Sequence, residues 1–119
     1  MGSHTEKNPY RLRIKLDLGG VVMGPGKAEL LRTVDSLGSI SAAARELGLN
    51  YRRAWFLLET LNATLGRPVV ETTKGGATGG GASLTKAGRA LLEAYDRCQE
   101  SVEAHSQDTL DALHQALRK

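Results

Sequence analysis

The sequence predicts a mainly α-helical fold with a small amount of β-structure. Apolar residues recur at helical spacing in four separate stretches. An alternating segment followed by two glycines near residue 20 is typical of a β-hairpin, and a glycine-rich stretch near residue 78 is typical of a second one. With 119 residues, the chain is long enough for one domain with a single modest core.

The first hairpin is predicted at residues 10–23. Apolar and polar side chains alternate strictly over 10–18, which is the period of a half-buried strand, and Gly19-Gly20 separates this segment from residues 21–23. Its polar face carries Arg11, Arg13 and Lys15; we expect a solvated face, with DNA contact as the alternative. Residues 1–9 are expected to form a tail, whose first four residues resemble a cloning remnant.

Three helices are predicted next, and each has its own start and stop signals. The first runs from Pro25, a residue that fits the first helical position, to Leu37. The second is short: it starts after Ser41, which we expect to be its N-cap, and ends before Gly48. Asn50 is expected to cap the third helix, which continues to about residue 65.

A second hairpin and a long final helix complete the predicted fold. Residues 69–73 and 82–84 can pair as strands around the glycine-rich segment 74–81, which has no apolar anchor and is expected to be a flexible tip. Thr85 then caps a helix that runs toward the C-terminus. The organisation expected is therefore a domain over residues 10–84 and a C-terminal helix over residues 85–119.

The two helices around Gly48 form the most informative unit of the sequence. So tight a turn forces them to cross steeply, and the small residues Ala42-Ala43-Ala44 let them approach closely. This pattern predicts a helix-turn-helix, in which the N-terminal end of the second helix enters the major groove of DNA. The hairpin that follows has the position and glycine content of a wing, which contacts the DNA backbone or minor groove.

On a helical wheel, Arg52 and Phe56 lie opposite the apolar stripe of the third helix, with Arg53 at the edge. An arginine in this position can bond guanine edges or phosphates, whereas a partner protein covering Phe56 is the alternative interpretation. Trp55 is expected to be a partly buried wedge rather than a base contact. The residues expected to contact DNA are Ser39, Ser41, Asn50, Tyr51, Arg52, Arg53, Phe56, Thr72, Thr73, Lys74 and Thr78.

Charge is distributed unevenly along the chain. Residues 1–90 contain 13 Lys or Arg and 7 Asp or Glu, whereas residues 91–119 contain 3 and 6. A basic body suits a phosphate-rich partner, and an acidic helix suits a protein partner. We therefore expect a two-fold homodimer through one face of the last helix, formed by Leu91, Tyr95, Cys98, Val102, Leu110, Leu113 and Leu117.

Several function classes lack their signatures in this sequence. The only cysteine, Cys98, allows no intrachain disulfide, and we expect it on a packed helix face. His105 and His114 are nine residues apart, so they form no i, i+4 metal pair. No nucleophile motif or phosphate-binding loop precedes a helix, and no stretch approaches the roughly 20 apolar residues of a membrane span. The expectation is a cytoplasmic protein that is not an enzyme and holds no metal.

With these motifs in place, residues 12–92 resemble the N-terminal DNA-binding domain of ModE-type, molybdate-dependent transcriptional regulators, within the wider group of LysR-like winged helices. The resemblance rests on the segments Gly38-Ser39-Ile40-Ser41, Tyr51-Arg52-Arg53-Ala54-Trp55, Gly66-Arg67-Pro68-Val69-Val70, the glycine-rich wing, and Leu84-Thr85-Lys86-Ala87-Gly88. The Tyr-x-x-Ala-Trp element and the wing separate this group from other LysR-type domains.

The resemblance implies a homodimeric, sequence-specific regulator of transcription, which we expect to be a repressor that binds an inverted repeat in double-stranded DNA. The alternative is a winged helix that has lost DNA binding and interacts with protein. Asn50 and Phe56 stand where Ser and an acidic residue are more usual, so no operator sequence is carried over. Sensing members carry molybdate-binding domains after this part. Here one helix follows, so we expect no cofactor and no molybdate site. The alternative is a molybdate-binding site formed by residues of both chains at a dimer interface.

Overall fold

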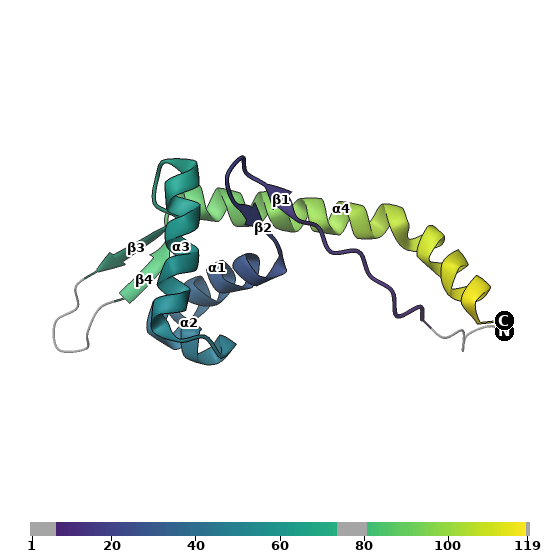
Figure 1. The fold of residues 1–119 in the computed structure, drawn as a ribbon, viewed down its shortest axis with the longest axis horizontal. Helices are drawn as coiled ribbons and strands as arrows, with labels where there is room; N and C mark the ends of the chain where they lie inside the picture. The colour runs from purple at the N-terminus through teal and green to yellow at the C-terminus, as the bar shows by residue number, and fades with distance from the viewer. Residues whose placement is uncertain (1–6, 74–80, 119) are drawn as a thin grey trace.

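The computed structural model describes residues 7–73 and 81–118. Figure 1 shows shorter helices and a hairpin gathered around one end of a long C-terminal helix. The elements in chain order are β1 (Leu16–Asp17), β2 (Val22–Met23), α1 (Pro25–Leu37), α2 (Ile40–Leu47), α3 (Tyr51–Leu65), β3 (Val70–Thr73), β4 (Gly81–Leu84) and α4 (Lys86–Leu117). The mainly helical fold with two hairpins and a long C-terminal helix is thus confirmed.

The core forms where α1 packs against α2, α3, β4 and the beginning of α4. From α1 it takes Leu30, Leu31 and Val34, which are almost fully buried. Burial of each such side chain contributes roughly 1.5–3 kcal/mol, so α1 is the main source of apolar stabilisation. The other buried apolar residues are Met23, Ala28, Ile40, Ala43, Ala44, Ala54, Leu58, Leu61, Val69, Leu84 and Tyr95.

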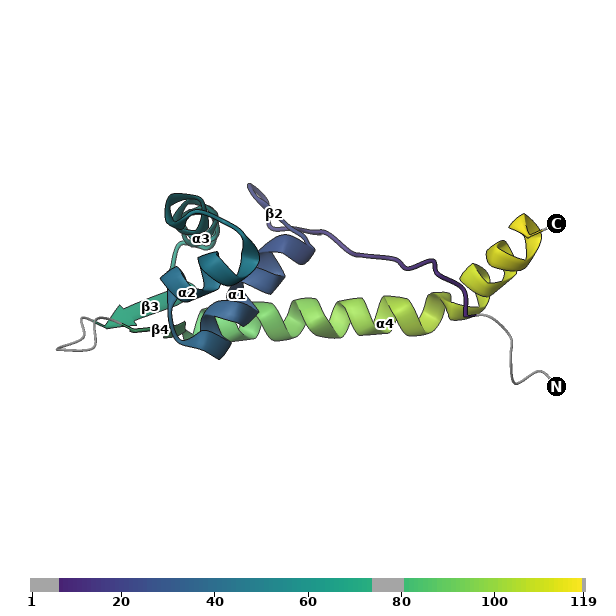
Figure 2. The ribbon, with the colours of Figure 1, turned by 90° about the horizontal axis from the view of Figure 1, so that it is seen from below.

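The predicted strand over residues 10–18 is much shorter in the structure. Only Leu16 and Asp17 pair with β2, opposite Met23 and Val22. The preceding residues 7–15, which we call the strap, instead run along α4 toward its C-terminal end (Figure 2). The alternating pattern is typical of any extended segment with one covered face, and here a helix rather than a strand provides the cover.

Side chains of α4 form hydrogen bonds with the backbone of the strap. These bonds replace the ones that a neighbouring strand would form in a sheet. The Gln99 amide accepts from the backbone N–H of Ile14 at 2.9 Å and donates to the carbonyl of Leu12 at 2.6 Å. The Tyr95 hydroxyl donates to the carbonyl of Ile14 at 3.0 Å. Burial raises the pKa of Tyr95, so its hydroxyl stays protonated and remains a donor.

Further contacts continue along the strap. Arg11 forms an ion pair with Glu103 at 2.8 Å, and the ring of Tyr10 meets that of His114 edge-on at 5.6 Å. Asn8 also donates a hydrogen bond to Asp111. Arg11 is exposed, as the sequence predicts for the polar face of this segment, yet it binds α4 as well as solvent.

The base of the wing is fastened to the body on both sides. Strands β3 and β4 pair from Val70 opposite Leu84 to Thr73 opposite Gly81. The Asn62 side chain at the end of α3 accepts from the N–H of Val69 at 2.8 Å. At the start of α4, Thr85 caps the helix by accepting from the N–H of Gly88, as predicted, and its own N–H donates to the carbonyl of Val69. These bonds fix the direction in which the hairpin leaves the body.

Candidate nucleic-acid interface

The helix-turn-helix begins with a capped α2. Ser39 has an extended backbone and its Oγ accepts from the N–H of Ala42 at 3.0 Å, so α2 starts at Ile40. The prediction that Ser41 is the N-cap is therefore wrong, because Ser41 already lies in the first helical turn. Ser41 is exposed and Ser39 is half-buried.

The turn between α2 and α3 depends on a glycine. Gly48 has φ of 71°, a left-handed conformation that residues with a Cβ rarely adopt. The next residue, Leu49, donates its N–H back to the carbonyl of Ala44 at 2.8 Å, which closes the end of α2. Asn50 then caps α3 by accepting from the N–H of Arg53 at 2.7 Å, as predicted. Its Nδ2 donor has no partner within the described residues.

Small residues hold α3 against the body. Ala43 and Ala44 on α2 and Ala54 on α3 are almost fully buried, so the two helices pack closely. Leu58 and Leu61 extend the buried side of α3. The opposite side faces outward, and Figure 2 shows α3 on the face of the molecule away from α4.

The outward side of α3 carries the predicted recognition residues. Arg52, Arg53 and Phe56 are exposed, and the guanidinium of Arg53 lies 5.5 Å from the centroid of the Phe56 ring. Within residues 7–73 and 81–118, neither Arg52 nor Arg53 forms an ion pair. In this part of the chain, neither guanidinium has a carboxylate within ion-pair distance.

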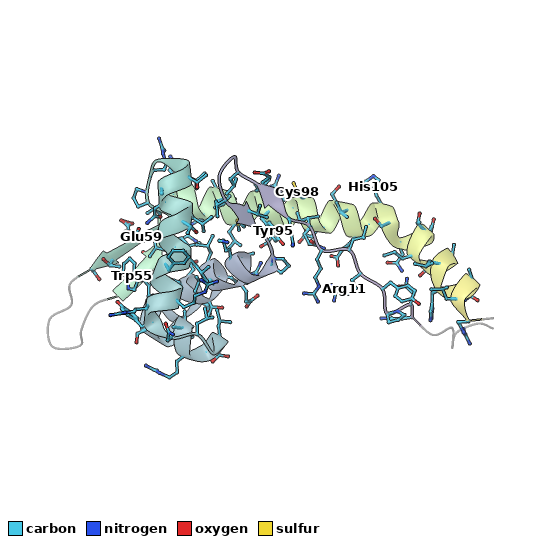
Figure 3. All side chains as sticks on the ribbon, in the orientation of Figure 1. Arg11, Trp55, Glu59, Tyr95, Cys98 and His105 are labelled. Carbon is cyan, nitrogen blue, oxygen red and sulfur yellow. The ribbon has the colours of Figure 1, made fainter. Side chains whose placement is uncertain are left out.

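Two other aromatic residues lie beside this surface. Tyr51 is exposed, and its ring meets that of Trp55 edge-on at 6.2 Å. Trp55 is half-buried and packs against the core, so the prediction of a partly buried wedge is confirmed. Figure 3 shows Trp55 and Glu59 on α3.

Glu59 is a candidate that the predicted site residues did not include. It lies on the outward side of α3, and its carboxylate accepts from the Asn62 side chain at 2.7 Å. A carboxylate in the major groove can accept from the amino group of cytosine. The sequence already indicates this candidate, because Glu59 lies beside Arg52 and Phe56 on the helical wheel.

The wing is described only at its base. Thr72 and Thr73 lie on β3 and are exposed, and the hydroxyl of Thr73 accepts from the N–H of Gly81 at 3.2 Å. Lys74 and Thr78, with residues 74–80 of the predicted flexible tip, lie outside the described residues, whereas Gly81, predicted as the last residue of the tip, lies in β4. The described wing residues and α3 thus belong to the same folded body.

The predicted dimer face of α4 divides into three groups. Tyr95 is buried within the chain and bonded to the strap, so it has no surface left for a partner and we remove it from this face. Leu91, Val102 and Leu110 are half-buried. Cys98, Leu113 and Leu117 are exposed, so Cys98 does not lie on a packed face within the chain. In Figure 3, Cys98 and His105 lie along one edge of α4, whereas Tyr95 and the strap residue Arg11 lie on its other side.

The described residues contain neither a membrane-spanning helix nor a cluster of metal-binding side chains. No helix in the described part of the chain is long and apolar enough to cross a membrane. Among residues 7–73 and 81–118, no group of three or more His, Cys, Asp or Glu side chains is arranged to hold a metal ion.

The two helices with their tight turn, followed by a hairpin, define a winged helix-turn-helix domain. Residues 26–89 match the family described as "Bacterial regulatory helix-turn-helix protein, lysR family". The match covers more than half of the sequence, and the chain belongs to this family. It is a DNA-binding domain of the kind found in transcriptional regulators.

The curated relatives include a molybdenum-pterin-binding protein and a transcriptional regulator. The chain is 44% identical over 89 residues to the molybdenum-pterin-binding protein MopB of Rhodobacter capsulatus, covering 75% of this chain and 33% of MopB. It is 36% identical over 92 residues to the transcriptional regulator ModE of Haemophilus influenzae, covering 77% of this chain and 36% of ModE. The chain therefore spans about a third of the length of these relatives, and what their names say they bind belongs to those proteins.

Solved structures with the same fold include a DNA complex. The DNA-binding domain of CbnR, in a crystal structure of its complex with DNA, is 25% identical to the chain with a TM-score of 0.56; the match covers 74% of this chain and 95% of that domain. Full-length CbnR complexed with its target DNA is 28% identical with a TM-score of 0.54, covering 73% of this chain and 28% of CbnR. The resemblance to ModE-type and LysR-like domains expected from the sequence is confirmed.

Proposed function

We propose that α3 enters the major groove of double-stranded DNA and reads base edges with Arg52 and Arg53. The observation that carries this proposal is the pair of unpaired, exposed arginines in the first turn of a helix whose other side is buried. The N-terminal end of a recognition helix is the part that reaches base edges. Arginine bonded in a bidentate way to guanine is the commonest specific contact of this kind.

The remaining candidate residues supply positioning rather than sequence reading. Tyr51 and the free amide donor of Asn50 sit at the start of α3, where phosphates flank the groove. Ser39 and Ser41, at the start of α2, and the wing residues Thr72, Thr73, Lys74 and Thr78 are assigned to the sugar-phosphate backbone or minor groove. The DNA complexes of CbnR support this assignment by their fold.

The regulator acts as a homodimer on an inverted repeat, and it represses transcription in the bacterial cytoplasm. Its two-fold contact is formed by Leu91, Cys98, Val102, Leu110, Leu113 and Leu117 of α4, of which Cys98, Leu113 and Leu117 are exposed. Exposed leucines at helical spacing on a long helix support this assembly, since a lone helix gains nothing by leaving them in water. A two-fold dimer places its half-sites one helical turn of DNA apart, roughly 34–36 Å, or a multiple of it.

Selection from a pool of random duplexes, using the purified chain at moderate salt, tests the proposal. We expect enrichment of an inverted repeat with guanines in each half-site. A selection that enriches no sequence contradicts base reading. It would favour the second candidate, a protein-interaction module, for which the exposed Phe56 is the specific observation.

A further inference from the structure

Phe56 is the only phenylalanine in the chain, and it is 57% exposed. The leucines of the same helix that face the body, Leu58 and Leu61, are almost fully buried. A phenyl ring with more than half of its surface in water gains much less from the hydrophobic effect than these buried leucines. Its position on the outward side of α3 therefore needs another explanation.

The surroundings of the ring are cationic on the side toward the start of α3, and Glu59, whose carboxylate accepts from Asn62, follows Phe56 by three residues. Phe56 follows Arg52 by four residues and Arg53 by three, so all three side chains share one face of the helix. The Arg53 guanidinium lies 5.5 Å from the ring centroid, within the range of a cation–π contact. This contact restrains the arginine side chain beside the ring before any partner binds.

We propose that Phe56 is a specificity-determining residue that packs against the C5-methyl group of a thymine in the major groove. The proposal rests on the proposed placement of α3 in that groove. A phenyl ring can neither donate nor accept an ordinary hydrogen bond, and the thymine methyl is the apolar group that base pairs present in the major groove. Arg53, held against the ring, contacts the neighbouring base or phosphate.

The charges of Arg52 and Arg53 favour DNA over a protein as the partner that binds this surface. The ring is flanked by two arginines that have no ion-pair partner in the described part of the chain. A polyanion compensates both charges at once and releases its counterions, whereas an apolar protein surface would have to desolvate them.

Replacement of thymine by deoxyuridine removes only the methyl group, so it tests the contact directly. On the duplex enriched by selection, each thymine is replaced in turn and the dissociation constant is measured. We expect one thymine per half-site at which the replacement weakens binding about fourfold, the effect of exposing one buried methyl group. The other replacements should leave the affinity unchanged.

The variant Phe56→Ala should bind the thymine and deoxyuridine duplexes equally. Tyr51→Ala is the matched control, because Tyr51 is also an exposed aromatic residue of α3. This control should retain the fourfold preference for thymine even where its overall affinity falls. Thermal melting of both variants verifies the fold, which we expect to be unchanged because neither ring is buried.

Two results overturn the inference while leaving DNA binding intact. One is a selected duplex at which no thymine replacement affects the affinity. The other is a thymine preference that persists in Phe56→Ala. A chain that enriches no duplex contradicts the proposed function itself, and the thymine contact with it.

Discussion

Gly88 lies in the first turn of α4, where alanine would ordinarily be the better helix former by about 1 kcal/mol. The reason for glycine is the close approach of Val69, the residue before β3. A Cβ on residue 88 would lie 2.1 Å from the carbonyl oxygen of Val69 and 2.9 Å from its carbonyl carbon. These are backbone atoms, and the Val69 carbonyl is held by the N–H of Thr85, so neither partner can move cheaply.

The variant Gly88→Ala should therefore lower the free energy of unfolding by about 2 kcal/mol or more, against the direction of helix propensity. Urea denaturation followed by circular dichroism measures the change. Ala90→Gly is the control for propensity alone, since residue 90 is exposed in the same helix. A Gly88→Ala variant as stable as the parent would contradict the close contact.

The carboxylate of Asp35 connects α1 to β4 and α4 through hydrogen bonds. Its carboxylate receives two hydrogen bonds from Arg89 of α4, at 3.0 and 3.3 Å, and one from the N–H of Leu84 of β4 at 3.3 Å. The hydrogen bond from Arg89, followed by that from Leu84, outweighs desolvation and holds the pKa of Asp35 below its ordinary value of 3.8.

Because this pKa is lowered in the folded chain, the contribution of Asp35 to stability is fully present above the ordinary aspartate pKa. It is lost as the pH falls through the folded value. Asp35→Asn should lower the unfolding free energy by roughly 1 kcal/mol at pH 7, and the difference from the parent should shrink below about pH 4. Urea titrations at several pH values measure it. A difference that stays constant down to pH 2 would contradict the assignment.

The bounds of helices are predicted well from the sequence where they depend only on residues within one helical turn. The bounds of α1 and α3 follow from Pro25, Asn50 and the glycines that end each helix, because capping involves residues within one turn. The prediction of Ser41 as the cap of α2 failed because Ser39, two residues earlier, has an equally suitable side chain and takes that position. Only the extended backbone at Ser39 distinguishes them.

The strap could not be predicted, since its partners are distant in sequence. An alternating segment pairs equally well with a strand or with polar side chains of a helix. Gln99, which replaces the neighbouring strand, is 85 residues from Ile14. Likewise the loss of Tyr95 from the predicted dimer face follows from the strap that covers it. The exposure of Arg52, Arg53 and Phe56 was predictable because the helical wheel of α3 is a local property.

Gln99→Ala should release the strap while leaving the helix-turn-helix folded. The change removes two hydrogen bonds to the strap backbone, and we expect a loss of about 1–2 kcal/mol of unfolding free energy. Amide hydrogen exchange at Ile14 should accelerate, whereas exchange in α3 should change little. Gln107→Ala is the control, as Gln107 bonds only to Asp111 of its own helix. Unchanged exchange at Ile14 would contradict the role of Gln99.

At the scale of the whole molecule, α4 extends well beyond the body that it helps to form, and the chain is 60 Å along its longest axis. The exposed Leu113 and Leu117 lie near the C-terminal end of α4, far from α3. An assembly through this part would join two domains without covering α3, which is what a symmetric DNA-binding dimer needs.

The parent chain should therefore sediment as a dimer at micromolar concentration, and Leu113→Asp should convert it to a monomer. A carboxylate at the two-fold contact would be buried without a partner. Gln115→Asp carries the same charge two residues further along, away from the apolar face, and should remain dimeric. Sedimentation of the parent as a monomer, or an unaffected Leu113→Asp dimer, would rule out this contact.

The ratio of the affinities for selected and random duplexes shows whether α3 reads base edges or contacts only phosphates. In titrations at fixed salt, Arg52→Ala or Arg53→Ala should weaken binding to the selected duplex by about 1–3 kcal/mol. Binding to random duplex should change much less, so the ratio should fall. If both variants lose the same factor on both duplexes, the arginines contact only phosphate, and the account of α3 as a base-reading helix is contradicted.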